Sequence, residues 1–481
     1  MIAICDGMEI IMSDIKDSKK AARVFEYFEE IANIPHTSGN TSPIADYLVS
    51  FAKGHGLEYI RDGYDNVIIK KNATPGYEGK PPIIIQGHTD MVAAVEDGRD
   101  VDMEKVGVKI IRDGDFLTAD GTTLGADDGI FMAYALAILD SDDIKHPALE
   151  ALFTSDEETG LVGAGGLDAS ALSGKRMINI DSDMEGIFTV GCAGGMRVDL
   201  TLPFEHCKNE EGLYAVTVTG LLGGHSGMEI DKGRENAIKI LFEAIEGSLI
   251  SSVKGGNADN AIPRNASAIV KPSSLEKLSS EVIPALLNKY RAKEEAIEIS
   301  VIRRDGVHPV YSPEDSGKII NAVHKTPTGV YKMSAEVKNL PETSSNLGII
   351  DTSGGRVTLS TSIRSSKNAE KLKLRDMIAM ISKEYGATLF EQGEYPAWEY
   401  KKDSSLREGM VRIYEEKYGH SPEVVIIHAG LECGIFSKKI DGLDCVSIGP
   451  DMLDIHTTEE RLSIPSAIRV YDYLITVLEE L

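Results

Sequence analysis

Apolar and polar positions alternate along this chain with two periods, and together these periods predict an α/β protein. Apolar residues recur at helical spacing over residues 19–34. Ser42-Pro43 then has the character of a helix start, with a capping residue followed by proline. Strand patterns follow at residues 57–61, 66–71 and 83–85. The last of these is a run of three isoleucines, which predicts a strand buried on both faces, as in a parallel sheet.

This buried strand leads into a polar turn that contains His88 and Asp90. Ligands in open α/β sheets gather at the carboxyl ends of the strands, so His88 is placed to offer a ring nitrogen to a metal ion. Asp90 lies two positions further on, and in extended chain it points to the same side. A histidine at a strand end is, taken alone, more often a hydrogen-bonded structural residue.

Acidic residues after two further core strands favour a metal-binding role for His88 over a structural one. They are Glu157 and Glu158 after residues 149–155, and Asp181 after residues 177–180. Asp127 and Asp128 precede residues 130–139, which are apolar nearly all round, like a helix buried under a sheet. Each acidic run alone fits a solvated loop, but carboxylates held against buried elements need a partner or a metal ion. Carboxylates and imidazole together are typical ligands of hydrolytic zinc sites, and pairs of zinc ions serve aminopeptidases.

Composition excludes several other classes of protein. The chain has 481 residues, enough for two or three domains, and it is 42% hydrophobic and 26% charged. Its 50 basic and 76 acidic residues give a net charge of −26, which disfavours nucleic acid and anionic membrane as partners. No apolar stretch is long enough to span a membrane, and Asp6, Glu9 and Asp14 do not fit a secretory signal. The five cysteines show no CxxC spacing, so we expect a cytoplasmic protein.

The middle of the chain has a different character. Residues 200–397 alternate strand patterns with amphipathic helix patterns, such as residues 235–250, but no acids follow the strands. We therefore expect an inserted α+β domain at 200–397, which divides a catalytic domain into residues 1–199 and 398–481.

Short motifs carry a resemblance to a known family over nearly the whole chain. In order they are HTDMV, TTLGADDG, TSDEETG, NIDSD, GGHSG and DIHTTEER. They resemble the dinuclear-zinc aminoacyl-histidine dipeptidases, also called cytosol non-specific dipeptidase or peptidase D, within the superfamily of carnosinases, aminoacylases and tripeptidases. NADNAIPR and HAGLECG are similar to the dipeptidase branch in particular, whereas Thr89 stands where relatives often have Leu. The resemblance implies an α/β, zinc-exopeptidase-like catalytic domain with a mostly parallel central sheet, plus an inserted α+β lid.

The same resemblance implies roles for individual residues. The implied metal ligands are His88, Asp127, Glu158, Asp181 and His456, with Asp127 bridging two ions. Asp90 matches the residue that orients His88, and Glu157 matches the general base. Asp128 is expected to shape its loop, since the peptide bond after the bridging aspartate is typically cis in this family.

Four further positions match substrate-binding residues of the family. They are His225 for the oxyanion, Asn260 for the scissile carbonyl, and Arg364 and Gly430 for the substrate's carboxylate. Without the resemblance, His225 would be taken for a surface residue. The implied cofactors are two divalent ions, zinc with cobalt or manganese as alternatives, and the implied partner is a small peptide substrate. Whether His225 acts in its own subunit or across a homodimer stays open.

The resemblance predicts a metal-dependent dipeptidase that hydrolyses unblocked dipeptides, including Xaa-His, by a water activated between two zinc ions with Glu157 as base. Two alternatives remain: an N-acyl-amino-acid deacylase or other amidohydrolase of the same superfamily, and a non-catalytic metal-binding homologue. The presence of Glu157 argues against the second, because metal storage needs no base. A serine hydrolase is disfavoured, because no GxSxG elbow is present.

Overall fold

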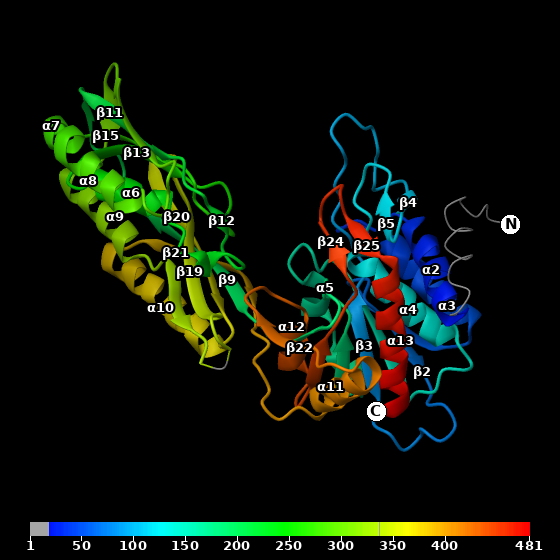
Figure 1. Cartoon of the computed structure of the whole chain (residues 1–481). Helices are drawn as coiled ribbons and strands as arrows, with labels where there is room; N and C mark the ends of the chain where they lie inside the picture. The colour runs from blue at the N-terminus through cyan, green and yellow to red at the C-terminus, as the bar shows by residue number, and fades with distance from the viewer. Residues whose placement is uncertain (1–18, 336) are drawn as a thin grey trace. The chain divides into compact units, whose positions relative to one another are not determined.

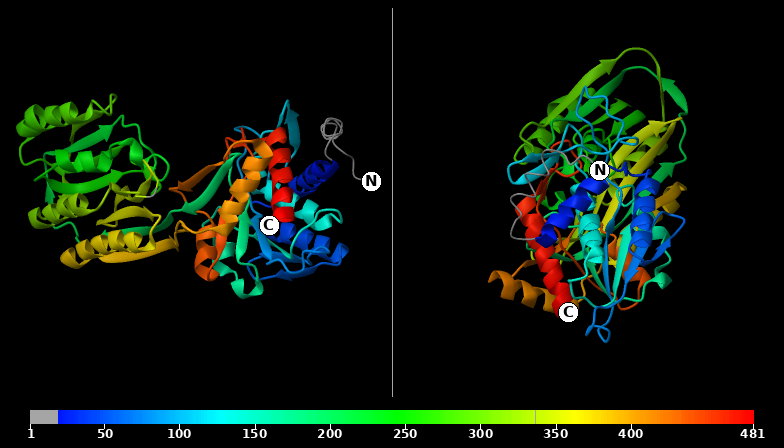
Figure 2. Two further views of the ribbon diagram at one scale, coloured as in Figure 1. Left: turned by 60° about the horizontal axis from the view of Figure 1, so that its bottom comes forward. Right: turned by 90° about the vertical axis from the view of Figure 1, so that its right-hand side faces the viewer.

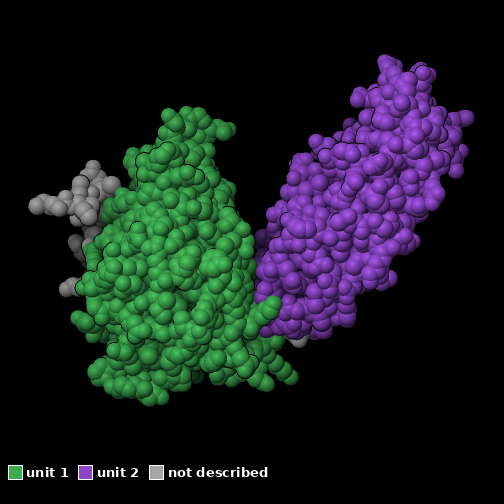
Figure 3. Space-filling view, turned by 180° about the vertical axis from the view of Figure 1, so that it is seen from behind, with its two compact units in different colours: residues 1–191, 400–425, 431–481 green, residues 192–399, 426–430 purple. Residues whose placement is uncertain are grey.

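The computed structural model describes residues 19–335 and 337–481. Asp6, Glu9 and Asp14, on which the prediction about a secretory signal depends, lie outside the described residues. The chain forms two compact units, coloured separately in Figure 3. Unit 1 comprises Met1–Gly191, Tyr400–Val425 and Leu431–Leu481, and unit 2 comprises Cys192–Glu399 and Ile426–Gly430. The predicted domain ranges differ from these units at residues 192–199, 398–399 and 426–430.

Unit 1 is built on a mixed sheet with the strand order β1-β2-β6-β3-β7-β23-β8-β22 (Figure 1). Its strands are β1 (Glu58–Arg61), β2 (Val67–Lys71), β3 (Ile83–His88), β6 (Leu149–Thr154), β7 (Arg176–Asn179), β8 (Ile187–Cys192), β22 (Glu423–Ile427) and β23 (Asp444–Ser447). The central strands β6, β3, β7 and β23 run parallel, whereas β1, β2 and β8 pair antiparallel beside them. Every residue of β3 and β6 is buried, as the isoleucine run predicts.

Helices cover this sheet and bury the apolar segment after Asp128. They are α2 (Lys19–Ala32), α3 (Ser42–Gly54), α4 (Ala126–Asp140), α5 (Val162–Gly166), α11 (Ser405–Tyr418), α12 (Cys433–Lys439) and α13 (Ile464–Glu480). Helix α4 packs on β3, and both α2 and α13 pack on α4 (Figures 1 and 2). Because α4 has protein on nearly all sides, it carries apolar residues all round instead of one apolar stripe.

A smaller antiparallel sheet joins distant parts of unit 1. It has the order β24-β25-β5-β4, with β4 (Ile110–Asp113), β5 (Phe116–Ala119), β24 (Met452–Leu453) and β25 (Arg461–Ser463). His456 lies between β24 and β25, and Asp127 follows β5. The pairing of β25 with β5 therefore fixes the C-terminal segment beside the segment that leads to Asp127.

Unit 2 is an α+β unit with the strand order β16-β11-β15-β13-β19-β20-β9-β21, and β18 pairs with β19. The strands are β9 (Gly194–Leu202), β11 (Leu213–Thr219), β13 (Leu249–Gly255), β15 (Ala266–Lys271), β16 (Glu298–Arg304), β18 (Gly329–Met333), β19 (Pro341–Ser353), β20 (Arg356–Ser365) and β21 (Thr388–Tyr395). The helices α6 (Ala237–Ala244), α8 (Ile283–Tyr290), α9 (Pro313–Lys325) and α10 (Asn368–Tyr385) lie on one face of this sheet (Figure 1). Alternating burial along β9 and β15 matches a sheet covered on one side.

One predicted element of unit 2 is wrong in its second half. The helix expected over residues 235–250 ends at Ala244, and Leu249–Gly255 forms β13 instead. Gly247 has a φ of 70°, which turns the chain, and β13 then pairs with β15 and β19. Within the described residues, no helix combines the length and the apolar character that a membrane span requires.

Candidate metal centre

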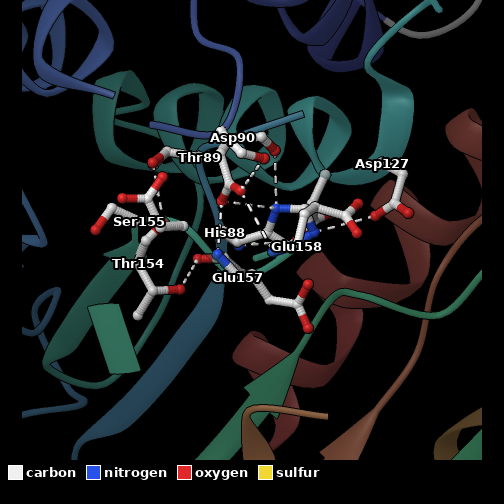
Figure 4. A network of polar contacts seen from close by, with 12 residues as sticks. His88, Thr89, Asp90, Asp127, Thr154, Ser155, Glu157 and Glu158 are labelled. Atoms are coloured by element: carbon white, nitrogen blue, oxygen red, sulfur yellow. Dashed lines mark hydrogen bonds and ion pairs between the residues drawn. The ribbon is translucent and has the colours of Figure 1, made fainter. Parts of the chain in front are cut away.

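His88 is the last residue of β3, and its two ring nitrogens face different groups (Figure 4). Nδ1 lies 2.9 Å from the backbone oxygen of Asp90 and 3.6 Å from its Oδ1. Nε2 lies 3.1 Å from Oδ1 of Asp127 and 3.7 Å from Oδ1 of Asp181. When Nδ1–H donates to the Asp90 carbonyl, the Nε2 lone pair is directed at two carboxylates, as in a metal-ligating histidine.

Asp127 connects two groups of potential ligands. Its Oδ1 faces His88, and its Oδ2 lies 3.1 Å from Nε2 of His456. Oε1 of Glu158 lies 2.7 Å from the same His456 nitrogen. Ligand atoms of His88, Asp127 and Asp181 lie within 4.8 Å of one another, and so do those of Asp127, Glu158 and His456. All five predicted ligands therefore meet in unit 1, and one carboxylate belongs to both groups.

The donor set fits divalent cations. It combines imidazole nitrogens with carboxylate oxygens, the ligands that zinc takes in hydrolytic sites. Oδ2 of Asp181 is buried and has no hydrogen-bond partner within residues 19–335 and 337–481. A buried carboxylate oxygen without a donor is costly unless a cation satisfies it. The side chains of this group could therefore hold metal ions.

The carboxylate of Asp90 organises the loop that carries Glu157 and Glu158. It accepts hydrogen bonds from Oγ of Ser38 at 2.8 Å and from the backbone N–H groups of Glu157 at 2.9 Å and Glu158 at 3.3 Å. Its backbone carbonyl accepts from His88 at the same time. Asp90 therefore connects the end of β3 to the turn after β6. It also contacts the ring of His88, which the resemblance implies that it orients.

Electrostatics at this centre reflect the crowding of carboxylates. Burial raises the pKa of Glu157, and repulsion from Asp181, Glu432 and Glu158 raises it further, against the opposing effect of His88. Burial likewise raises the pKa of Asp181. Hydrogen bonds to Asp127 and Glu158 raise the pKa of His456 to about 10. Positive charge placed among these groups would favour the ionised forms of Glu157 and Asp181 and the neutral form of His456.

Asp128 has a different environment from Asp127. It is buried, and burial raises its pKa well above the usual range. Its Oδ2 accepts the backbone N–H of His88 at 3.2 Å, and the peptide bond between Asp127 and Asp128 is cis, as the resemblance implies. Asp128 supports the loop and, within the described residues, is in none of the groups of potential ligands.

Two buried glutamates near the site, Glu432 and Glu460, were not predicted from the pattern of acids after core strands. Glu460 accepts the backbone N–H groups of Leu124 at 2.8 Å, Gly125 at 3.1 Å and Ala126 at 2.8 Å, which clamps the His456 segment onto the turn before Asp127. Glu432 is fully buried next to the ligand-bearing strands, and burial raises its pKa to about 7. Both lie inside motifs that carry the family resemblance, DIHTTEER and HAGLECG, and this was the only feature of the sequence that could have identified them.

The predicted substrate residues lie in unit 2. His225 is half-buried in the short strand β12 (Gly224–His225) rather than a plain surface residue. Its Nδ1 accepts the backbone N–H groups of Gly227 at 3.3 Å and Met228 at 3.1 Å. Burial and the charge of Arg364 lower its pKa, so the ring is neutral and carries its hydrogen on Nε2.

Arg364, Gly430 and Asn260 lie in the same unit as this histidine. Nη1 of Arg364 donates to the hydroxyl of Tyr395 at 3.2 Å, and its Nε is buried without a hydrogen-bond acceptor in the described part of the chain. A Cβ at Gly430 would lie 2.6 Å from the Tyr395 ring, so only glycine allows this approach. Asn260 is exposed, and its backbone oxygen accepts the N–H of Ser226 at 2.8 Å, directly beside His225.

Comparison with known proteins is consistent with this geometry. Residues 84–480 match the family model described as Peptidase family M20/M25/M40. The chain belongs to this family. It is 34% identical over 473 residues to the cytosol non-specific dipeptidase of Escherichia coli (strain K12), covering 95% of this chain and 97% of that protein. The predicted family and fold class are confirmed, and family membership makes the chain a peptidase.

Two solved structures have a fold similar to that of this chain. The aminoacylhistidine dipeptidase from Vibrio alginolyticus matches with a TM-score of 0.87 and 35% identity, covering 98% of this chain and 99% of that one. The aminopeptidase PepT from Bacillus cereus matches with a TM-score of 0.60 and 19% identity, covering 96% and 98%, which shows a shared fold.

Proposed function

We propose that this peptidase is a dipeptidase that binds two zinc ions and hydrolyses unblocked dipeptides, Xaa-His among them. The observation that carries the proposal is the position of Asp127, whose two oxygens face His88 and His456. Five donors exceed the ligand set of one tetrahedral zinc ion, but they suit two ions that share a carboxylate. The names of the two relatives that are about a third identical, both dipeptidases, support the choice of substrate.

In this proposal the two metal ions would supply Lewis acidity toward the peptide carbonyl and acidify a water molecule. Glu157 accepts the proton of the attacking water and passes it to the leaving amine. Asp90 holds the backbone of Glu157, and Glu158 binds metal from the adjacent position. The division between the two glutamates follows from their surroundings, since Glu158 contacts His456.

Unit 2 supplies recognition of the substrate in the same proposal. The Arg364 guanidinium binds the substrate's carboxylate as a fork, with the backbone N–H of Gly430 as a second donor. His225 donates from Nε2 to the oxyanion, and Asn260 contacts the scissile carbonyl. The partner is a small peptide, neither nucleic acid nor membrane, and we include a cytoplasmic location and a homodimer in the proposal. Cobalt or manganese could replace zinc.

The test is a metal-reconstitution assay. Protein stripped with a chelator is reloaded with zinc, cobalt or manganese, analysed for bound metal, and assayed with a dipeptide, its amide and an N-acetyl amino acid. We expect about two ions per chain from the number of donors, and turnover of the free dipeptide only. Full activity in the stripped protein would contradict the metal centre, and preference for the N-acetyl compound would identify a deacylase.

A further inference from the structure

A layer of buried polar side chains lies directly behind the predicted metal ligands in unit 1. Gln86 precedes His88 by two positions on β3, and Asn179 precedes Asp181 by two at the end of β7. Nδ2 of Asn179 donates to Oε1 of Gln86 at 2.8 Å, and Nε2 of Gln86 donates to Oγ1 of Thr154 at 3.2 Å. These hydrogen bonds connect β7, β3 and β6, the three strands that lead into the metal centre.

Glu432 enters this layer from the residue before α12. Its Oε2 lies 2.5 Å from Nε2 of Gln86 and 2.6 Å from Oγ1 of Thr154. Glu432, Gln86 and Thr154 are each 0% exposed. One carboxylate oxygen therefore bonds both to Gln86 of β3 and to Thr154 of β6, the residue that pairs with His88 in the register of the two strands.

Stability alone does not account for an acid at this position. Burying a carboxyl group is costly unless all of its bonding capacity is used, and Oε1 of Glu432 has no hydrogen-bond partner among the described residues. An apolar side chain of similar volume would fill the same space at lower cost. What the acid provides is a connection between two strands that lead to predicted ligands, since His88 follows Gln86 by two residues and Glu158 follows Thr154 by four.

We propose that Glu432 is a positioning residue for the metal centre, which sets the separation of His88 from Glu158 by tying β3 to β6 through Gln86 and Thr154. The inference rests on the proposed function, because it assumes that these side chains bind metal. Metal affinity depends on ligand separation to within a few tenths of an ångström. Groups that hold the ligands in place contribute about 10–100-fold to metal affinity in comparable sites.

Glu150 offers a matched control on the same strand. It is a buried glutamate at the other end of β6, where its carboxylate accepts the backbone N–H groups of Ser173 at 3.0 Å and Gly174 at 2.9 Å. Its replacement removes a comparable set of hydrogen bonds away from the ligands. Glu150→Ala should therefore lower the unfolding temperature of the metal-free protein and leave zinc affinity unchanged.

The experiment measures the zinc dissociation constant by competition with a chromogenic chelator, together with the unfolding temperature of the metal-free protein. We expect Glu432→Ala to weaken zinc binding by about 10–100-fold. Glu432→Gln should recover most of that loss, because its amide oxygen can occupy the position of Oε2 and keep both ties. Thr154→Val should weaken binding by less, because the bond from Gln86 to Glu432 remains. Its effect should be smaller in the Glu432→Ala background than in wild type, since both changes remove the bond between Thr154 and Glu432.

The outcomes separate this inference from the proposed function. Wild-type protein that fails to bind zinc would overturn the proposed function and this inference with it. Tight binding by wild type together with equal affinity in Glu432→Ala would overturn the inference alone, as would a Glu432→Gln variant that binds no better than Glu432→Ala. If Glu432→Ala does not fold, Thr154→Val decides the question, and unchanged zinc affinity in that variant would overturn the positioning role.

Discussion

Glu157 and Glu158 are adjacent and chemically identical, yet their surroundings suit them to different tasks. Glu158 lies 2.7 Å from His456 and shares a ligand group with Asp127. Glu157 is in one group, with His88 and Glu158, whereas Glu158 is in two, and burial and nearby carboxylates raise the pKa of Glu157. Neighbouring side chains diverge along the backbone, so one can bind metal while the other faces a water molecule.

Replacing each of these two glutamates by glutamine separates the tasks. Glu157→Gln should lower kcat by at least about 10²–10⁴-fold, because the amide cannot accept a proton, and it should leave the metal content unchanged. Glu158→Gln should lower the metal content itself. The measurement pairs steady-state kinetics with elemental analysis of each variant. Loss of metal in Glu157→Gln, or its retention of most activity, would show that the two roles are assigned incorrectly.

His428 in unit 2 predicts a pH-dependent stability. It is buried, its Nε2 lies 2.7 Å from Oγ of Ser344, and burial and the charge of Arg364 lower its pKa to about 4. The unfolded chain takes up this proton near pH 6.5 and the folded protein only near pH 4. The contribution is therefore fully present above pH 6.5 and is lost as the pH falls toward 4, by about 3 kcal/mol at most.

The check compares wild type with His428→Gln, whose amide can still bond to Ser344. Thermal unfolding between about pH 7 and about pH 4 should show a steeper loss of stability in wild type, since the variant lacks this proton uptake. All other titrating groups are common to both proteins, so the difference between their pH profiles isolates His428. Parallel profiles across this range would contradict the prediction.

The packing of α4 against β3 brings Asp127 and His88 together, and Gly87 permits it. A Cβ at Gly87 would lie 2.1 Å from Oδ2 of Asp128 and 2.4 Å from Cδ1 of Phe131. Both contacts are far shorter than van der Waals distance, so any side chain would push the start of α4 away from the strand. The close packing of α4 on β3, each of which carries a predicted ligand, therefore depends on the absence of a side chain at Gly87.

Gly87→Ala should accordingly destabilise the protein by about 1–3 kcal/mol, as other overpacked cores do. It should also weaken zinc binding, because His88 and Asp127 would separate. Gly79→Ala is the control, since no heavy atom of a non-adjacent described residue lies within 4 Å of a Cβ at that position. Thermal unfolding and zinc titration of both variants test the prediction, and equal behaviour of the two would refute it.

The chain as a whole places metal-binding and substrate-binding candidates in separate units. The predicted ligands and Glu157 belong to unit 1, whereas Arg364, His225, Asn260 and Gly430 belong to unit 2. The specificity of a dipeptidase for short substrates requires recognition of both ends of the peptide. Loss of the carboxylate-binding group should therefore change which substrates are cleaved and not only how fast.

Arg364→Ala should reduce kcat/KM for a free dipeptide by about 30-fold or more, since truncating one partner of a buried charge pair costs about 2–5 kcal/mol. The rate for the amidated dipeptide should change little, so the preference for the free carboxylate should collapse. Arg303→Ala, at an exposed position on β16, is the matched control. A preference that is unchanged in Arg364→Ala would remove Arg364 from the substrate site.

Much of unit 1 could be read from local pattern. The buried strand at Ile83–His88, the apolar helix after Asp128 and the final helix are determined by side chains that interact within a few residues of one another. Acids directly after core strands also identify candidate ligands, because burying them without a cation is costly. The helix predicted over residues 235–250 extends past its end at Ala244, because β13 begins at Leu249 and its pairing with β19 depends on a strand far away in the sequence.

Only the tertiary structure determined which of the candidate site residues contact one another. Asp127 and His456 are 329 residues apart, and their contact depends on the pairing of β25 with β5 and on the bonds that Glu460 makes. The tie from Glu432 to β3 and β6 likewise joins segments that no local pattern relates. Sequence determined which residue types stand at the strand ends, since that depends on local burial and period. Only the folded chain, by closing long loops around the sheet, decided which of their atoms face one another.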